Sequence, residues 1–391
     1  MKIFLFLLIV SALPRMASAQ ALMGLPETLA SIEAKNPELK ALRHEADAAK
    51  ADARADAAMP APEVSFGYLW HGRKDVSVSQ GLDWAALSGR RRAVADAVDS
   101  LAEASYAVSR QDVLTRACRA YVGAVKCNML VSLFSMRLVN SGRLVRIARG
   151  RVAAGSGRQS DVASADMSRA QALAELTKAQ AELDGHMATL AALNGGEAMA
   201  VADTALAAVG SIGGDFDTWY ASVEGRISAL ALSNARHRVA SADVGVARAN
   251  AMPQVSIGYM GEFTPSESYQ GVTLAVSLPV WSARRRVEQA RLAALAAQSR
   301  VEAERQAVRL ALQAAFNRSL MLGRVAAELR ESVERNDGRD LALRALSAGE
   351  ISATEALMAE NLYYDAAREA VNAEAEYQLS LVDLYACVEA R

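Results

Sequence analysis

The sequence predicts a mainly α-helical protein built from two similar units, each of which carries a pair of short strands. Three observations support this fold class. The 391-residue chain is rich in alanine and poor in aromatic residues, which make up 5% of it. Two long stretches contain no proline, which favours long helices. The phrase PEVSFGY at 62–68 recurs as PQVSIGY at 253–259, which indicates an internal duplication.

The composition excludes several classes of protein. The 43 Lys and Arg balance the 44 Asp and Glu, and the formal net charge is −1, so there is no electrostatic reason to expect a nucleic-acid partner. Three cysteines and four histidines are too few for a disulfide scaffold or a metal cage. The sequence has no glycine-rich phosphate loop, nucleophile elbow or paired-carboxylate motif. We therefore expect no enzyme activity, cofactor or resident metal.

The beginning of the chain has the pattern of a secretory signal. Lys2 precedes the apolar run 3–10, and the small residues Ala17, Ser18 and Ala19 follow. This pattern predicts a signal peptide over residues 1–19, cleaved after Ala19, and therefore export from the cytoplasm. The apolar run is too short to cross a hydrocarbon core of roughly 30 Å as a helix. Because no later stretch is long, apolar and uncharged, any membrane crossing must use strands.

Two further landmarks recur in the same order along the chain. The arginines at 90–92 recur at 284–286, and Ala154-Gly155 recurs as Ala348-Gly349. Each landmark is displaced by roughly 190 residues, which is too long for a solenoid and fits the duplication of a whole unit.

The duplication predicts the organisation of the chain. We expect a first repeat over residues 20–194 and a second repeat over residues 221–391. The stretch 195–220 between them is rich in Gly and Ala and lacks a strong period, so we interpret it as a connector.

Each unit is predicted to contain a helix, two strands and a long helical hairpin. Asn36-Pro37 has the residues of an N-cap and a first helical position, and the helix is expected to run to about Ala58. Apolar and small residues then alternate through four segments, which predicts strands with one apolar face. Each segment is about nine residues long, the length of a tilted membrane-crossing strand, although a soluble hairpin would show the same alternation. The alternating segments lie around 64–68, 76–79, 255–259 and 272–278.

The proline-free stretches predict the longest helices. The run 90–152 would be roughly 95 Å long as one helix, and 283–347 is its counterpart. Turns at 153–159 and 347–353 reverse the chain. Ser352 and Glu355 have the spacing of a capping box for the returning helix, and Ser156 and Gln159 offer a similar pair.

The number of strands limits what one chain can build. Four amphipathic strands cannot close a barrel, because open edges would leave unpaired backbone groups in lipid. Small barrels need about eight strands or more. Several copies of the chain are therefore required, and three copies give twelve strands.

This organisation resembles the TolC family of outer-membrane efflux and secretion channels. The resemblance rests on short sequence motifs that follow one another in a fixed order along the whole mature chain. They are NPELKA (36–41), AMPAPEVS (58–65), AAG with SDV (153–162), AMPQVS (251–256), and SAGE with TEAL (347–357). It implies a homotrimer with a twelve-stranded barrel in the outer membrane and an α-helical tunnel in the periplasm. It also implies that the helical tips bind a periplasmic adaptor, which links the channel to an inner-membrane pump.

The resemblance also implies site residues near the tips. Asp161 and Glu355 match the acidic residues that line the tunnel entrance of the family, where a trimer would turn each into a ring of like charge. The alternative is that both are helix N-terminal acids that favour the helix dipole. The residues expected to contact the adaptor are Gly155, Ser156, Gly157, Gly349, Glu350 and Ile351.

The sequence departs from the family at the tip. Leu346 and Ile351 replace a tyrosine and an arginine that help some members stay closed, and Met358 replaces a second acid. The closed state is therefore expected to be held by different contacts.

Other residues have both a functional and an ordinary interpretation. Four aromatic residues lie near the predicted strand ends, and we expect them either to form an interfacial girdle or simply to pack against their neighbours. They are Tyr68, Trp84, Tyr259 and Trp281. The two arginine triplets are candidates for contact with anionic lipid headgroups. Six arginines approach the first tip, and we expect them to form a solvated helix face, to bind an adaptor, or to pair with acids on neighbouring helices. They are Arg137, Arg143, Arg146, Arg149, Arg151 and Arg158. We expect three cysteines to be packed thiols that form no disulfide bond, namely Cys118, Cys127 and Cys387.

The sequence thus predicts a passive exit duct of a tripartite efflux system. Its resemblance to the CzcC-like heavy-metal branch suggests metal cations as cargo, and multidrug efflux or type I secretion are the alternatives within the family. The rival interpretation is a soluble periplasmic coiled-coil or adaptor-like protein, which would not need two strand pairs.

Overall fold

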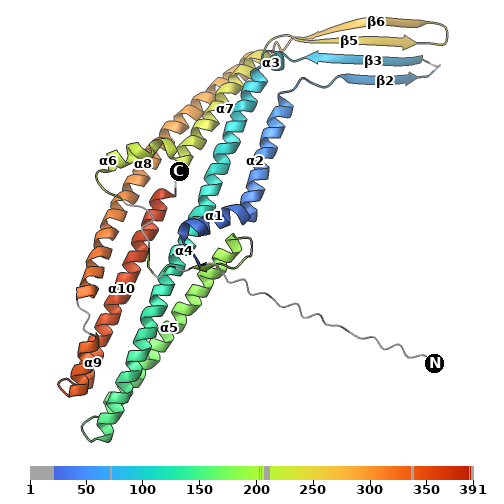
Figure 1. Ribbon diagram of the computed structural model, residues 1–391. Coiled ribbons are helices and arrows are strands. Elements are labelled where there is room, and N and C mark those ends of the chain that lie inside the picture. Colours follow the sequence, from blue (N-terminus) through green and yellow to red (C-terminus); the bar gives the residue numbers. More distant parts are fainter. Residues whose placement is uncertain are drawn as a thin grey trace, which may run out of the picture.

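The structure is a computed structural model, and it describes residues 22–70, 73–201, 203, 205–206, 212–335, 339–386 and 388. The predicted signal peptide 1–19 and Cys387 lie outside the described residues. Long helices make up most of the molecule, and a sheet extends from one end of them (Figure 1).

The elements follow the same order twice. The first series is α1 (Leu25–Lys35), α2 (Pro37–Asp56), β2 (Glu63–Leu69), β3 (Arg73–Leu82), α3 (Trp84–Leu87), α4 (Arg90–Ala153) and α5 (Gln159–Leu193). The second series is α6 (Phe216–Val223), α7 (Ser228–Asn250), β5 (Gln254–Phe263), β6 (Ser268–Ser277), α8 (Ala283–Arg335), α9 (Arg339–Ala348) and α10 (Ala353–Tyr385). Two short parallel strands, β1 (Leu22–Met23) and β4 (Ala200–Val201), pair beside them.

Local signals set the helix boundaries of the first series. The Asn36 side chain accepts a hydrogen bond from the Leu39 N–H, and Pro37 opens α2, as predicted. The predicted helix 90–152 is confirmed, since α4 runs without a break from Arg90 to Ala153, through Gly142. At about 1.5 Å per residue this helix is roughly 96 Å long.

Two boundaries of the second series differ from the prediction. The single run predicted over 283–347 is described as two helices, α8 and α9, and residues 336–338 between them lie outside the described residues. The predicted connector 195–220 contains β4 and the start of α6. Helix α6 begins there because Asp215 accepts a hydrogen bond from the Asp217 N–H, and because Phe216 packs against Phe316 of α8, with ring centroids 5.7 Å apart.

The four predicted strands form one antiparallel sheet in the order β2-β3-β5-β6. The hairpin of the first series pairs with the hairpin of the second through β3 and β5, with Val78 opposite Tyr259. The register places the apolar residues of all four strands on one face. These residues include Val64, Phe66, Val76, Val78, Val255, Ile257, Val272, Leu274 and Val276. The opposite face carries mainly serine, glycine, threonine and other small or polar residues.

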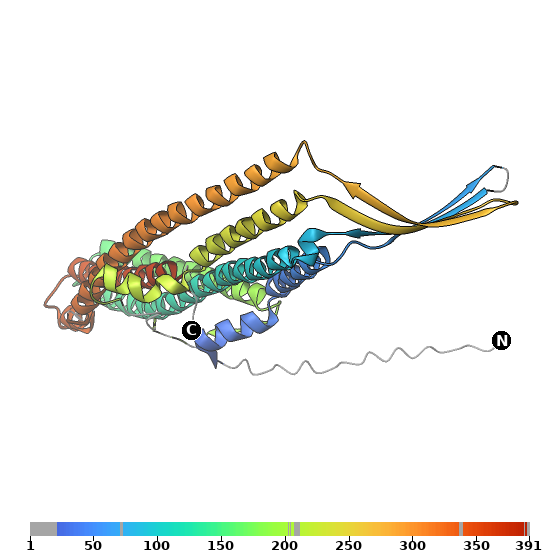
Figure 2. The ribbon, with the colours of Figure 1, turned by 90° about the horizontal axis from the view of Figure 1, so that it is seen from above.

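The helices form a wall one layer thick. In the half near the sheet, the neighbours are α2, α4, α7 and α8 in that order, which matches the order of the strands they join (Figure 2). In the far half, α5 packs on α4, α4 on α10, and α10 on α8 and α9. The wall and the sheet therefore share two open edges, one beginning at β2 and α2 and the other at β6 and α8.

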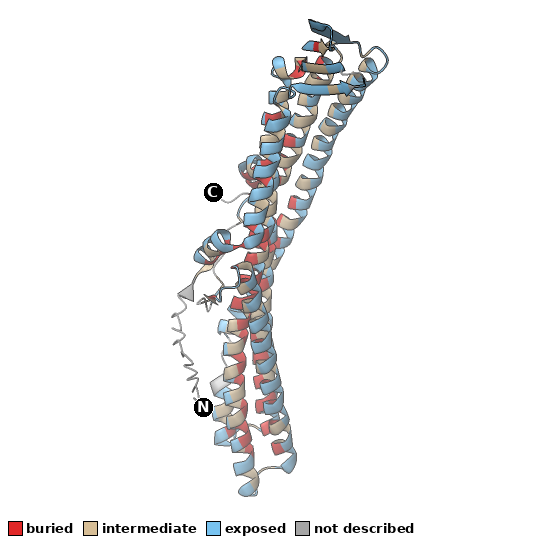
Figure 3. Cartoon of the chain, turned by 90° about the vertical axis from the view of Figure 1, so that its right-hand side faces the viewer, coloured by how far each residue is buried: buried red, intermediate tan, exposed pale blue. Residues whose placement is uncertain are grey.

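Buried side chains lie along the helical wall, whereas the sheet is largely exposed (Figure 3). Where α1 meets α4, Ile32 and Leu39 pack with Val113, Tyr121 and Leu190. Helix α4 is long and apolar enough to cross a membrane by length and composition, but half of the apolar window is buried inside the protein. We therefore interpret α4 as the core helix of the wall.

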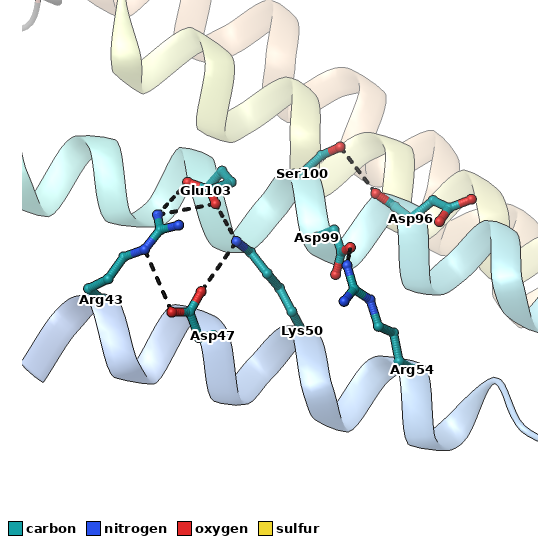
Figure 4. Close-up of polar contacts among 8 residues, drawn as sticks. All are labelled: Arg43, Asp47, Lys50, Arg54, Asp96, Asp99, Ser100 and Glu103. Carbon is teal, nitrogen blue, oxygen red and sulfur yellow. Dashed lines mark hydrogen bonds and ion pairs between the residues drawn. The ribbon is translucent and has the colours of Figure 1, made fainter.

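Ion pairs join α2 to α4 near the sheet (Figure 4). Glu103 of α4 accepts hydrogen bonds from Arg43, at 3.0 Å, and from Lys50. Asp99 accepts one from Arg54 at 2.6 Å. These groups are partly exposed, so the pairs contribute little to stability and chiefly set which faces of the two helices meet.

The double role of Asn36 gives a test of the fold. Asn36 is 2% exposed, caps α2, and donates from Nδ2 to the Leu193 carbonyl at 2.7 Å. We expect Asn36→Ala to lower the free energy of unfolding by about 1–2 kcal/mol, because both hydrogen bonds are lost. Asn36→Ser keeps a cap acceptor without placing a charge against the Leu193 carbonyl, and it should lose less. Thermal denaturation followed by circular dichroism measures the ranking, and an unchanged Asn36→Ala variant would contradict it.

Candidate functional site

The end of the wall far from the sheet is formed by two tight turns. Gly155 follows α4 with φ +74°, and Gly349 follows α9 with φ +82°, a backbone conformation that favours glycine. The turns lie side by side, because the Arg151 guanidinium donates to the Ile351 carbonyl at 3.2 Å. The two predicted tip segments therefore form one continuous surface.

An apolar cluster holds the two turns together from within. It joins α4, α5, α9 and α10 through the buried residues Leu144, Val145, Ala148, Val162, Ala165, Leu346, Ala353, Ala356 and Leu357. Ile351 packs against this cluster, and Leu346 is 1% exposed within it. The two apolar residues that depart from the family pattern thus serve as packing contacts at the tip.

The predicted adaptor-contact residues differ in exposure. Gly155, Ser156, Gly349 and Glu350 are exposed, whereas Gly157 and Ile351 are half-buried. A side chain at Gly157 would lie only 2.9 Å from the Val152 backbone nitrogen, so this glycine is required by close packing. The accessible part of the tip is therefore formed by Gly155, Ser156, Gly349 and Glu350.

Asp161 and Glu355 occupy equivalent positions in the two returning helices. The Ser352 N–H and hydroxyl donate to the Glu355 carboxylate at 2.7 and 2.8 Å, and Ser352 Oγ accepts from the Glu355 N–H. This confirms the predicted capping box. Hydrogen bonds from Ser352 hold the pKa of Glu355 below its usual value.

The similar pair predicted at Ser156 and Gln159 is wrong. Helix α5 begins at Gln159, and its N-cap is Arg158, whose N–H donates to the Asp161 carboxylate at 3.3 Å. The Ser156 hydroxyl instead donates to the Arg151 carbonyl, because the tight turn directs it back to α4. Both acids therefore act as helix N-terminal acids, and a role in the entrance remains a prediction.

The predicted arginine face divides into different environments. Arg149 pairs with Asp166 of α5 at 3.1 Å and remains partly exposed. Arg137 is 1% exposed and pairs with Glu175 of α5, so a solvated face is wrong for this residue and the alternative of pairing with an acid on a neighbouring helix is confirmed. It lies on the buried stripe of α4 with Leu130, Leu133 and Leu144, and the helical spacing of these residues is the signal that could have identified it.

The candidate girdle residues lie at different heights of the sheet. Tyr68 is near the hairpin end and Tyr259 is near the middle of β5, and both are exposed. Trp281 follows β6 at the helical end and is 94% exposed. Trp84 is half-buried and donates its indole N–H to the Pro253 carbonyl, so its ring is fixed where sheet and helix meet.

The remaining chemistry-bearing residues give no metal or redox centre in the described part of the chain. No group of three or more His, Cys, Asp or Glu side chains there could hold a metal ion. Burial raises the pKa of the Cys118 thiol to about 11, and Cys127 is buried, so both are unreactive thiols.

Comparison with known proteins gives a family match over part of the chain and a shared fold over most of it. Residues 219–388 match the family model described as outer membrane efflux protein. The outer-membrane channel OprN superposes with a TM-score of 0.74 at 20% identity, over 93% of this chain and 89% of OprN. CusC superposes with a TM-score of 0.77 at 14% identity, over 95% of this chain and 93% of CusC. The open state of the Neisseria gonorrhoeae MtrE channel superposes with a TM-score of 0.72 at 17% identity, over 93% of this chain and 88% of MtrE.

A comparison of the sequence with curated proteins gives no match. The family match covers the second series of elements, and the structural matches extend the same fold over both. The resemblance to TolC-like channels is therefore confirmed at the level of the fold, and residues 219–388 are similar to the outer membrane efflux protein family.

Proposed function

We propose that three copies of this chain close into a passive exit duct, with the sheets in the outer membrane and the helical wall in the periplasm. The proposal rests on the two open edges that the sheet and the helical wall share. Strands β2 and β6 each have only one neighbour, so each leaves one row of backbone N–H and C=O groups without a partner strand. In lipid every such group must be paired, and pairing β2 of one copy with β6 of the next satisfies both edges.

The α8 edge of the wall has the character of an interface. Five large apolar side chains on α8 are exposed, namely Leu292, Leu295, Leu310, Met321 and Val325. Leu292, Leu310 and Met321 are spaced 18 and 11 residues apart, close to five and three helical turns, and so lie on one face. A contact between this edge and the opposite edge of the next copy is head-to-tail, and repetition closes it into a ring. Three copies supply twelve strands, enough for a barrel.

The two faces of the sheet fit this placement. The apolar face would meet lipid, and the small polar residues would line the lumen. At the helical end, Trp281 lies at the boundary, and the arginines at 284–286 directly after it are exposed. We assign these arginines to anionic lipid headgroups at the inner face of the membrane, because cations at a helix N-terminus need a nearby anion.

We further propose that the tip is the periplasmic entrance and binds an adaptor that connects it to an inner-membrane pump. The duct itself has no energy source, so transport is driven by that pump. In a trimer, Asp161 and Glu355 would each form a ring of three carboxylates, which favours cations. Metal cations are therefore the cargo we propose. The apolar contact of Leu346 with Ile351 would hold the entrance closed in place of a polar latch.

The trimer can be tested at the α8 edge. We expect Leu310→Glu to reduce the recovery of trimer in detergent roughly tenfold or more, because each interface would bury an unpaired charge. Glu304→Lys is the control, since Glu304 is exposed on α8 and lies about 120° around the helix from Leu310. Light scattering coupled to size exclusion measures the mass. A wild-type protein that is monomeric in detergent, or a water-soluble one, would contradict the duct and favour the soluble adaptor-like alternative.

The entrance can be tested without disturbing the helix caps. Asp161→Asn combined with Glu355→Gln removes both charges, while the amide oxygens still accept the capping hydrogen bonds. We expect the cation-over-anion permeability ratio in planar bilayers to fall roughly twofold or more. Asp166→Asn on α5 is the control and should leave the ratio unchanged. If the double variant keeps the wild-type reversal potential, the two acids do not line the entrance.

A further inference from the structure

Glu360 of α10 is a buried carboxyl group without a hydrogen-bond partner. It lies five residues beyond Glu355, about 7.5 Å further along the helix from the tip. Its residue is 7% exposed, and neither carboxylate oxygen has a hydrogen bond or an ion pair with any residue that the structure describes. An ionised carboxylate in such a place carries a large desolvation cost unless it is paired.

The cation whose charge acts on Glu360 is Arg137 of α4, which is bonded through both terminal nitrogens, whereas its Nε has no hydrogen-bond partner among the described residues. Its Nη1 donates to Glu175 of α5, its Nη2 donates to the Asn361 side chain at 2.9 Å, and its guanidinium lies over the Tyr364 ring. Tyr364 is fully buried, and its hydroxyl accepts from Asn140 at 3.0 Å. This polar layer is fixed on α4, α5 and α10, so Arg137 cannot turn to Glu360 without breaking other bonds.

The charges around Glu360 do not compensate a second carboxylate. Helix α4 presents Arg137 and helix α5 presents Glu175, which neutralise each other. On α10, Arg368 is shared among Glu175, Asp365 and Glu369. From α8, the apolar Val333 packs against the neighbouring cluster that contains Tyr364. Helix α9, which also packs on α10, carries Arg344, and this residue has a contact of its own. Burial accordingly raises the pKa of Glu360 to about 7, against the opposing effect of Arg137.

We propose that Glu360 is a proton-binding site inside the helical wall, and that loss of its proton loosens α10 from α4 at the tip end of the protein. With the proton bound, the layer holds one carboxylate against one guanidinium and remains packed. With the proton lost, α10 must shift to give the carboxylate access to water. A role in opening the entrance rests on the proposed duct, whereas the proton site does not.

The direction of the pH effect follows from linkage. The pKa of Glu360 is about 7 in the packed protein and close to 4.5 once the group is in water, so the packed state binds the proton more tightly. The resulting stabilisation is complete below pH 4.5 and is lost as the pH rises to about 7. Glu355, whose pKa is lowered, titrates below this window and in the opposite direction.

Hydrogen–deuterium exchange of the detergent-solubilised protein tests the site. We expect protection of the 353–368 segment, corrected for intrinsic exchange rates, to fall roughly 70-fold between pH 5 and pH 8. In Glu360→Gln the protection should be independent of pH, because no proton is gained or lost. Glu376→Gln, at an exposed position on the same helix, is the matched control and should retain the wild-type fall.

A second variant removes the concern that the glutamine amide itself lacks a partner. Glu360→Leu has no polar atoms, and it should also give protection that does not change between pH 5 and pH 8. The proposal is overturned if wild-type protection is constant with pH, or if the fall persists in both Glu360 variants. Because exchange is measured without transport, this result is independent of whether the protein proves to be a trimeric duct.

Discussion

Backbone hydrogen bonding at the two edges of the four-stranded sheet governs the whole architecture. Each strand continues directly into a helix, so the order β2-β3-β5-β6 is repeated by α2, α4, α7 and α8, and the helical wall inherits the same two open edges. A sheet of this kind cannot be placed in lipid alone, because its unpaired groups would each cost several kcal/mol. The proposed ring of copies follows from this constraint, and the exposed apolar face of α8 extends it to the helices.

The helical wall combines apolar clusters with a small number of polar contacts whose environments differ sharply. Glu355 and Glu360 lie on the same helix, yet their pKa values move in opposite directions. Glu355 is exposed and accepts hydrogen bonds from Ser352, which stabilise its charge. Glu360 is buried beside an arginine that is already paired, so its charge is destabilised. Two similar side chains can therefore cap a helix and bind a proton within two turns.

Much of the fold could be predicted because its signals are local. The cap at Asn36, the extent of α4, the four strands and the capping box of Ser352 and Glu355 all depend on residues a few positions apart. The errors also have physical reasons. Helix α6 is short and is stabilised by packing on Phe316 of α8, and the N-terminus of α5 is satisfied by Asp161 rather than Ser156. A solvated face is wrong for Arg137, because its position on an apolar stripe buries it beside Glu175 of the neighbouring helix α5.

The duplication, the type of each major element and the amphipathic character of the strands could be predicted from the sequence alone, since periodicity and capping are properties of neighbouring residues. Three features are seen only in the tertiary structure. Strand β3 pairs with β5, the two tips lie side by side, and Arg137 donates a hydrogen bond to Asn361, which is 224 positions away in the sequence. Such contacts join distant segments, and the burial they produce arises only when helices pack. A carboxyl group's affinity for a proton depends on that burial, and for this reason Glu360 could not be singled out from the sequence.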